Sequence, residues 1–342
     1  MGASETSERE PAVTAPVADE AARLAERLVP VLCRATGWDA PRAEGLVRLS
    51  GGVSRETWRL DAVAGRRRRA LILQRQRSFG SGSWLDTELE ARVLRAARAA
   101  GVPCAEPLAW STQPEELGLP YLLVEYVDGE TIPQRILRDP RFAPARAKLA
   151  RQYGEALGRI QRVACGELPD LAPQDPLAHY QEILDGIGKP SPALALGFRW
   201  LALNRPPAGD PVVVHGDFRN GNGIVDPALG LRAVIDWELA HLGDPLEDLG
   251  WFCIRAWRFG EPLRAGGFGR TDDIIAGYEA TSGRKVERES LRWWNIMGTV
   301  RWAVICLIQG AAHSKGIRRS LEHAVTGRRA AEAEFDLMLL LP

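Results

Sequence analysis

The sequence lacks a net charge. Its 342 residues include 44 Lys and Arg against 44 Asp and Glu, so the formal charge at pH 7 is zero. A chain without excess charge has no global electric field to attract DNA, RNA or an anionic membrane. We therefore expect a small-molecule partner, and neither nucleic acid nor a membrane.

Paired cysteines are also missing. None of the five cysteines belongs to a C-x-x-C pair, and they are scattered along the chain at Cys33, Cys104, Cys165, Cys253 and Cys306. An odd number of widely spaced cysteines argues against both a disulfide framework and a zinc site. Such cysteines suit a reducing cytoplasm.

Long hydrophobic runs are absent too. No window of the sequence approaches the 18 uncharged apolar residues that a membrane span requires. Residues 1–17 are polar, contain proline, and have no basic region followed by an apolar stretch. We interpret them as a disordered tail, and we expect a cytoplasmic protein.

The rest of the chain divides by character into two parts. A chain of this length exceeds the usual size of a single core, so two parts are expected. Residues 18–127 alternate strands with helices, including a strand, a glycine turn and a second strand over 46–63. Residues 128–342 are mainly helical, with short buried strands at 212–214 and 233–235.

Two of the short strands end in carboxylates. Residues 212–214 lead to Asp217, residues 233–235 lead to Asp236, and Asn222 lies five positions after Asp217. If these strands pair as a hairpin, the three side chains can converge on one point. Such oxygen ligands suit Mg²⁺, which takes one or two carboxylates together with substrate phosphates. Protein kinases place their catalytic Asp and metal-binding Asn at the same spacing.

Two other interpretations of this region stay open. Asp, Asn and Gly favour turns, so the polar residues alone would also suit ordinary loops. A hydrolase with a carboxylate-bound metal would use similar residues, although it would leave the first part of the chain unexplained.

A long polar motif carries a family resemblance. The strings HGDFRNGN, beginning at His215, and IDWELAHLGDPLEDLGWF, beginning at Ile235, resemble the aminoglycoside-phosphotransferase-like superfamily. The resemblance runs from about residue 45 onward and is strongest to kinase-like domains joined to acyl-CoA dehydrogenases. It implies a bilobal, protein-kinase-like α+β fold. A small β-rich lobe, residues 18–127, would bind the nucleotide, and a larger helical lobe, residues 128–342, would hold the catalytic and acceptor-binding residues.

The same resemblance implies an activity and assigns roles. It implies a kinase that uses ATP and Mg²⁺ to phosphorylate a hydroxyl of a small molecule. Asp217 would be the catalytic carboxylate, and Asn222 and Asp236 would hold Mg²⁺. The residues expected to support the site structurally are His215, Asp244 and Asp248.

Further residues are expected to bind the nucleotide. The glycine turn would cover the phosphates with backbone N–H groups, although a plain hairpin turn also favours Gly-Gly. Glu90, in a predicted helix over 86–100, would orient a basic partner. The residues expected to bind the nucleotide are Ser50, Gly51, Gly52, Val53, Ser54, Gln74, Arg75, Glu90, and the hinge residues Glu125, Tyr126 and Val127.

The strand lysine of kinases is missing. Kinases place a strand Lys against the phosphates, whereas this strand reads ALILQRQRS, with Gln74 at the family's basic position and Arg75 next. Neighbouring strand residues face opposite sides, so only a bulge or a register shift would bring Arg75 to the Gln74 side. Because Gln supplies no charge, a non-catalytic nucleotide-binding protein stays an alternative.

The acceptor side is expected in the helical part. Its tryptophans suit either a pocket or core packing; they are Trp251, Trp257, Trp293, Trp294 and Trp302. Arg255, Arg258 and Arg301 would suit an anionic acceptor. Resemblance to the dehydrogenase-linked kinases suggests a hydroxy acid or a hydroxyacyl thioester. An aminoglycoside kinase is an alternative. Aminoglycosides are polycations, and this region has no long acidic run that would bind one. A Ser/Thr protein kinase is disfavoured, because no A-P-E segment follows Asp236.

Overall fold

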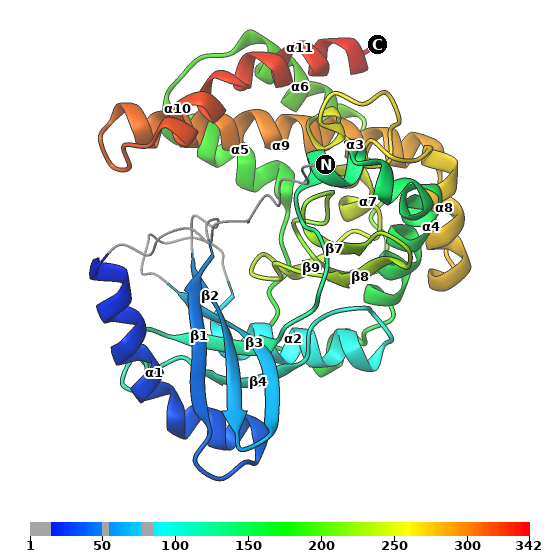
Figure 1. Ribbon diagram of the computed structural model, residues 1–342. Helices are drawn as coiled ribbons and strands as arrows, with labels where there is room; N and C mark the ends of the chain where they lie inside the picture. The colour runs from blue at the N-terminus through cyan, green and yellow to red at the C-terminus, as the bar shows by residue number, and fades with distance from the viewer. Residues whose placement is uncertain (1–14, 50–54, 77–84) are drawn as a thin grey trace, which may run out of the picture. The chain divides into compact units, whose positions relative to one another are not determined.

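The chain forms two compact units (Figure 1). The computed structural model describes residues 15–49, 55–76 and 85–342, with side chains described from residue 19 onward. The first unit lies within residues 1–81 and 107–126, and the second lies within residues 82–106 and 127–342. The lobe boundary expected after residue 127 stays a prediction.

The first unit is an antiparallel sheet with one long helix. The helix is α1 (Ala15–Thr36), and the strands are β1 (Arg42–Arg48), β2 (Arg55–Ala64), β3 (Arg67–Gln76), β4 (Pro107–Ser111) and β5 (Tyr121–Glu125). The strand order is β1-β2-β3-β5-β4. The described ladder between β2 and β3 runs in continuous register from Arg55 opposite Gln76 to Ala64 opposite Arg67.

Alternation along the strands gives this sheet one apolar face. Trp58 on β2 and Leu73 on β3 are cross-strand partners and are fully buried. Leu28 and Leu32 of α1 pack in the same cluster. Burial of each such side chain contributes about 1.5–3 kcal/mol. The period of two along β3 therefore decides which of its residues face α1 and which face the other side.

The second unit is mainly helical (Figure 1). Its helices are α2 (Thr87–Ala99), α3 (Pro133–Arg138), α4 (Ala143–Ile160), α5 (Pro176–Ile187), α6 (Pro192–Leu203), α7 (Glu247–Phe252), α8 (Thr271–Ser282), α9 (Arg288–Ser314), α10 (Leu321–Arg328) and α11 (Ala330–Leu340). Two short antiparallel pairs complete it: β6 (Val212–Val214) with β9 (His241–Gly243), and β7 (Gly223–Asp226) with β8 (Gly230–Val234).

Glycines let α4 and α8 approach closely. A Cβ atom at Gly277 of α8 would lie 2.1 Å from the carbonyl oxygen of Arg151 on α4, and one at Gly154 of α4 would lie 2.0 Å from the carbonyl oxygen of Ile274. Real Cβ atoms do not approach other atoms so closely, so each position requires glycine unless the helices separate. This contact fixes the spacing between α4 and α8.

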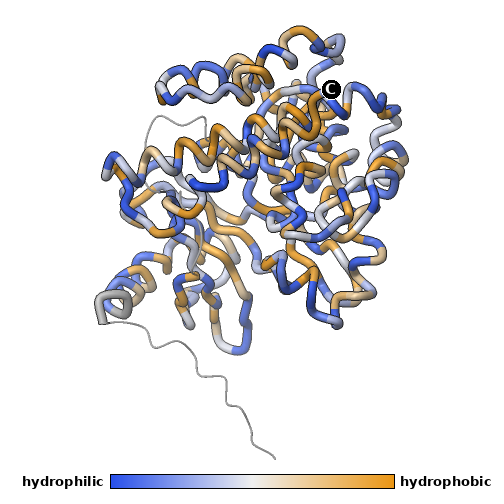
Figure 2. Tube along the Cα trace, turned by 90° about the horizontal axis from the view of Figure 1, so that it is seen from above, coloured by the Kyte–Doolittle hydropathy of each residue, from blue (hydrophilic) through white to orange (hydrophobic). Residues whose placement is uncertain are grey.

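The helix α9 is the central core helix of the second unit. Its buried face packs with α5, α6 and α11 in one hydrophobic cluster. Within the described chain, α9 is the one helix long and apolar enough to cross a membrane by length and composition, but 61% of its apolar window is buried inside the protein. Figure 2 shows hydrophobic and hydrophilic residues interleaved along the helical traces. The burial is that of a core helix, although α9 is more apolar than we expected from the sequence.

The observed architecture confirms the predicted fold class. A β-rich first unit precedes a larger, mainly helical second unit, and short strands in the second unit carry the polar motif. The fold is therefore α+β, as expected.

Candidate active site

The loop after β6 carries Asp217. The backbone turns sharply at Gly216, where φ is +83° and a Cβ atom would lie 2.2 Å from the carbonyl oxygen of Leu239. Asp248, at the start of α7, braces the turn: its carboxylate accepts hydrogen bonds from the backbone N–H groups of His215 (2.7 Å) and Gly216 (3.1 Å). The loop is thus held from the side of α7.

Three side chains hold the carboxylate of Asp217. The indole N–H of Trp251 donates to Oδ1 at 2.9 Å, and the amide of Asn222 donates to Oδ2 at 2.7 Å. The Nε of Arg219 lies 3.0 Å from Oδ2. The Asp217 side chain keeps 17% of its surface exposed. Its position is therefore constrained while it remains accessible to a small molecule.

His215 connects the two segments that end in carboxylates. Its ring is fully buried; Nδ1 accepts from the backbone N–H of Asp217 at 3.2 Å, and Nε2 lies 3.1 Å from the carbonyl oxygen of Ile235, the residue before Asp236. These partners assign the proton to Nε2. Burial lowers the pKa of His215 to about 4, so the ring is neutral at pH 7.

Asn222 and Asp236 lie at the open end of the β7–β8 hairpin, Asn222 just before β7 and Asp236 just after β8. Gly223 pairs with Val234, and the backbone N–H of Ile235 donates to the carbonyl oxygen of Asn222 at 3.0 Å. The hairpin considered from the sequence, between β6 and the strand before Asp236, does not form, because β6 pairs with β9. The β7–β8 hairpin and the His215 ring, rather than strand pairing, connect the two carboxylate segments.

The donor set at this place fits Mg²⁺. The Asn222 amide N–H groups engage Asp217, which leaves the amide oxygen as the atom able to bind a cation. Asp236 adopts a left-handed conformation, with φ at +71°. Among the described residues, no group of three or more His, Cys, Asp or Glu is gathered as a metal site. An amide and a carboxylate oxygen are the kind of partial set that Mg²⁺ completes with phosphates and water.

A buried charged cluster packs against the Asp217 loop. It is formed by His241, Glu247, Asp248 and Arg301. Glu247 lies 3.2 Å from His241 and 3.8 Å from Arg301. Burial and repulsion by Glu247 raise the pKa of Asp248. Burial opposes the charged ring of His241, but Glu247 outweighs it and raises its pKa. Sequence reasoning missed Glu247 and His241, although both belong to the ELAHLGDPLED string.

Arg301, which the sequence suggested as a residue that would suit an anionic acceptor, is buried. It is 6% exposed, donates to the carbonyl oxygen of Gly216 at 2.5 Å, and stacks over Trp251 with 4.2 Å to the ring centre. Asp244 has a local role, because its carboxylate accepts from the backbone N–H of Leu246 at 2.8 Å before α7 begins. Burial raises the pKa of Asp244.

Arg219 and Trp251 are the contacts of Asp217 that the sequence did not reveal. Arg219 stands two positions after Asp217 and also stacks over Trp257, 4.6 Å from the ring centre. The signal available in the sequence was a basic residue inside HGDFRN. Trp251 is 34 residues away along the chain, so no local pattern indicated its contact.

The expected nucleotide-binding residues are spread over the molecule. Ser50, Gly51, Gly52, Val53 and Ser54 lie outside the described residues. Glu90 is buried on α2 in the second unit. Glu125 ends β5, Tyr126 donates its backbone N–H to the carbonyl oxygen of Ala70 at 3.1 Å, and Val127 begins the second unit. The chain passes from the first unit to the second between Tyr126 and Val127, and the hinge role of these residues stays a prediction.

Gln74 and Arg75 lie on opposite faces of β3. Arg75 faces the α1 side, is 7% exposed, and forms ion pairs of 2.5 Å with Glu20 of α1 and Glu56 of β2. Gln74 is half-buried on the other face and accepts a hydrogen bond from Arg55. The continuous register of the described β2–β3 ladder keeps Arg75 away from the Gln74 side.

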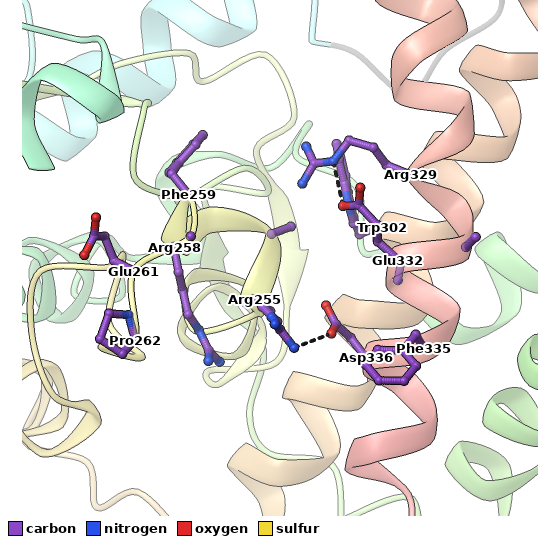
Figure 3. A pocket seen from close by; sticks show the side chains of 14 residues that line it. Arg255, Arg258, Phe259, Glu261, Pro262, Trp302, Arg329, Glu332, Phe335 and Asp336 are labelled. Atoms are coloured by element: carbon purple, nitrogen blue, oxygen red, sulfur yellow. Dashed lines mark hydrogen bonds and ion pairs between the residues drawn. The ribbon is translucent and has the colours of Figure 1, made fainter. Parts of the chain in front are cut away.

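A pocket of about 940 Å³ opens on the second unit (Figure 3). Arg255 pairs with Asp336 at 3.0 Å across it, and Arg329 lies 3.2 Å from Glu332. A second pocket of about 540 Å³ also has Arg255, Arg258 and Asp336 in its wall. The two pockets are therefore adjacent and share a strongly charged boundary.

Arg258, in the short 3₁₀ turn Arg255–Arg258, is the cation of this boundary that has no carboxylate partner among the described residues. It donates to the carbonyl oxygen of Cys253 at 2.7 Å. Burial, followed by the nearby charges of Arg264 and Arg255, lowers its pKa. An aromatic series joins the pocket to the Asp217 loop: the ring of Trp257 lies 4.8 Å from Trp302, in the pocket wall, and 5.0 Å from Trp251.

Comparison with known proteins identifies relatives of this chain. Residues 45–293 match the model of the phosphotransferase enzyme family. Acyl-CoA dehydrogenase family member 10 of Mus musculus is 30% identical over 177 residues, which cover 49% of this chain and 16% of that protein. Viomycin phosphotransferase of Streptomyces vinaceus is 30% identical over 141 residues, covering 38% of this chain and 48% of that protein. The chain thus matches less than half the length of each.

Solved structures share the fold. A candidate aminoglycoside phosphotransferase of Ralstonia eutropha JMP134 superposes with a TM-score of 0.73 at 21% identity, covering 92% of this chain and 97% of that one. Spectinomycin phosphotransferase, in complex with ADP and spectinomycin, gives a TM-score of 0.61 at 13% identity over 92% of this chain and 98% of that one. The chain belongs to the phosphotransferase enzyme family.

Proposed function

We propose that this protein transfers the γ-phosphate of ATP, with Mg²⁺, to a hydroxyl of a small metabolite that carries an acidic group. The observation that carries the proposal is the arrangement around Asp217, whose carboxylate is held by Trp251 and Asn222 yet remains partly exposed. Positioning and electrostatic stabilisation account for nearly all of the catalysis in phosphoryl transfer, and this loop supplies a positioned acid.

Asp217 acts on the acceptor. Its carboxylate accepts a hydrogen bond from the acceptor hydroxyl and takes the proton as the hydroxyl oxygen bonds to the γ-phosphorus. The bond from that phosphorus to the β–γ bridging oxygen breaks, and ADP leaves. Arg219, 3.0 Å from Asp217, balances the charge of the carboxylate before the proton arrives. A positioned general base typically contributes 10²–10⁴-fold to the rate.

Asn222 and Asp236 hold the metal. When bound, Mg²⁺ neutralises charge on the β- and γ-phosphates. Asn222 couples this role to that of Asp217, because its amide N–H groups fix the base while its amide oxygen is left for the cation. Asp236 is placed by the end of β8 and by the His215 contact with Ile235.

The acidic nature of the acceptor is inferred from the arginine-lined pocket. Arg258 is partly buried there and has two further arginines close enough to lower its pKa. A carboxylate or phosphate of the acceptor would relieve that repulsion, since a guanidinium matches the geometry of both anions. Hydroxy acids and hydroxyacyl thioesters have such groups, and the relatives named for acyl-CoA dehydrogenases support this class.

An antibiotic kinase is the second candidate. Viomycin phosphotransferase and the spectinomycin and kanamycin enzymes among the relatives favour it. The arginine cluster around Arg258 disfavours it, because Arg258, Arg255 and Arg264 would repel a polycation such as an aminoglycoside. A non-catalytic nucleotide-binding protein is the third candidate. The observation that favours it is the neutral Gln74 at the position of the kinase lysine.

The cytoplasm is the expected place for this reaction. All five cysteines are free, and three of them are buried. Free thiols without disulfide partners accord with a reducing compartment.

ADP release with Mg-ATP tests the proposal. The acceptors are matched pairs that differ in one charge, such as a hydroxy acid and its amide, or a hydroxyacyl-CoA and the corresponding pantetheine thioester, together with an aminoglycoside. Release that needs the acidic member and is absent in Asp217→Asn supports the proposal. Release with the aminoglycoside alone supports the antibiotic kinase, and bound Mg-ATP without release on any acceptor supports the non-catalytic alternative.

A variant of the pocket tests in the same assay whether the pocket binds the acceptor. Arg258→Gln should raise the KM of the acidic acceptor about tenfold or more with little change in kcat, because a charged hydrogen bond to the ground state and the transition state is lost equally. An unchanged KM would remove the pocket from the acceptor site.

A further inference from the structure

Kinases use a lysine on β3 against the phosphates of the nucleotide. The family resemblance places the neutral Gln74 at that position, so the described part of β3 has no cation there. Arg75 is not a substitute, because it is buried on the opposite face of the sheet in ion pairs with Glu20 and Glu56. The charge must therefore come from another element if nucleotide phosphates bind to this sheet.

Arg55 lies on the Gln74 face of the sheet. It is the first residue of β2 and pairs with Gln76 of β3, while Thr57, two residues on, pairs with Gln74. Residues 55, 57, 74 and 76 therefore share one face, because side chains alternate along each strand. The Nη1 of Arg55 donates to the Oε1 of Gln74 at 3.2 Å. The guanidinium thus lies beside the position that the lysine would occupy.

The burial of Arg55 marks it as more than a surface residue. It is only 6% exposed, and an arginine is seldom buried unless other groups hold it in place. A guanidinium keeps its charge under burial and offers a planar set of donors that matches a phosphate.

Gln74 suits the role of a partner to Arg55. Its amide oxygen accepts from the guanidinium without neutralising it, whereas a lysine at position 74 would repel Arg55. A neutral residue at position 74 on β3 is therefore compatible with an arginine at position 55 on β2, whereas a lysine there would not be.

We propose that Arg55 is the residue that contacts the phosphates of the nucleotide, and that Gln74 positions it. This inference rests on the proposed use of a nucleotide. It replaces a cation on β3 by a cation on the neighbouring strand, and it makes Gln74 a positioning residue instead of a defect in the site.

Relocation of the charge tests the inference. Binding of Mg-ADP is measured by calorimetry for the wild type, Arg55→Gln, Gln74→Lys, and the double variant Arg55→Gln/Gln74→Lys. Arg55→Gln should weaken binding about 10- to 100-fold, since a charged hydrogen bond to phosphate is lost. The double variant, which returns the cation to β3, should regain most of the affinity.

Two further variants separate binding from folding. Arg68→Gln removes a 57% exposed arginine of β3 that pairs with Asp61 and Glu44, and it should bind Mg-ADP as the wild type does. Arg55→Lys keeps the charge, so it should fold and lose less affinity than Arg55→Gln. Thermal unfolding of every variant shows whether the sheet is intact.

Each outcome decides the question. Unchanged affinity in Arg55→Gln overturns the proposal, as does a double variant that binds no better than Arg55→Gln, because the role of Arg55 would then be structural. A wild type that binds no Mg-ADP would overturn the proposed function itself, a result distinct from a failure of Arg55 alone.

Discussion

At the scale of single residues, the carboxylate of Asp217 is the best-supported feature of the site. Trp251 comes from α7, Arg219 from the loop itself and Asn222 from the start of the β7–β8 hairpin, and all three donate to it. Three donors fix the orientation of the carboxylate before any substrate binds. Such preorganisation is the usual means by which a phosphotransferase lowers its barrier.

Asp217→Asn should reduce kcat by at least about 100-fold, because the general base is lost. The fold should survive, with a loss of about 1 kcal/mol, since the new NH₂ group faces a donor where an oxygen accepted before. Acceptor-dependent ADP release and urea unfolding measure the two effects. Asp210→Asn, at an exposed position shortly before β6, is the matched control. Retained turnover in Asp217→Asn would refute the assigned role.

His215 should make stability depend on pH. Its pKa falls from 6.5 to about 4 on folding, so between these values the unfolded chain binds more protons, and stability rises with pH. The full effect is about 3 kcal/mol, present above pH 6.5 and lost as the pH falls towards 4. The raised pKa values of Asp248 and Asp244 act in the opposite direction, so the comparison needs a variant that retains both.

The difference in unfolding free energy between wild type and His215→Gln isolates this residue. The advantage of the wild type should shrink steadily from pH 7 to pH 4. A difference that stays constant over this range would mean that His215 is not buried as a neutral ring.

At the scale of elements, the close packing of α4 against α8 supports the site. The α4–α8 contact depends on glycines that leave no room for a side chain. Tyr153 of α4 in turn packs against Phe218, the residue after Asp217, with ring centres 5.7 Å apart. The spacing of α4 and α8 therefore affects the position of the loop that carries Asp217.

Gly277→Ala should destabilise the protein by more than about 2 kcal/mol, because the new Cβ atom would lie 2.1 Å from the Arg151 carbonyl oxygen. Gly186→Ala, within α5 and with nothing within 4 Å of the new atom, should instead stabilise by up to about 1 kcal/mol through helix propensity. The urea midpoints of the two variants measure the contrast. Equal shifts in the same direction would contradict the packing argument.

Strand pairing shows the limit of sequence patterns at this scale. The strands of residues 212–214 and 233–235 were visible as short apolar runs, but the choice of partner was not. A run of three apolar residues carries too little alternation to specify a partner, so β6 pairs with β9 for reasons set by the rest of the unit.

At the scale of the whole molecule, nucleotide binding should be the main source of ligand-dependent stability. A ligand that binds only the folded state at 100 times its Kd stabilises by about 2.7 kcal/mol. Mg-ADP should raise the melting temperature of the wild type, and EDTA should remove most of the increase, because Asn222 and Asp236 act through the cation. In Asp236→Asn the difference between Mg²⁺ and EDTA should shrink strongly.

An exposed carboxylate provides the control for this measurement. Asp226→Asn, at the far end of the β7–β8 hairpin from Asn222, should retain the full Mg²⁺ dependence. A Mg²⁺ effect that is unchanged in Asp236→Asn would argue against a metal role for that residue.

The sequence by itself determined the family and the fold class, and it indicated candidate residues for the chemistry. These properties follow from patterns that are local in the chain: a carboxylate and an amide five positions apart, glycines at turns, and a period of two or 3.6 in the apolar residues. The constellation from His215 to Asp248 is such a pattern, and the family comparison agrees with it. The catalytic and metal roles themselves stay predictions until the variants are measured.

The tertiary structure alone decided which residues face one another. The sequence offered Arg301 only as one residue that would suit an anionic acceptor, with a surface helix position as the alternative. The structure instead buries it against Gly216, because its place on α9 is set by core packing. The register of β2 against β3 turns Arg75 towards α1 and sets Arg55 beside Gln74. A shift of one residue would exchange these faces, and no property of the linear sequence contains that register. The proposed role of Arg55 at the phosphates therefore depends on the tertiary structure.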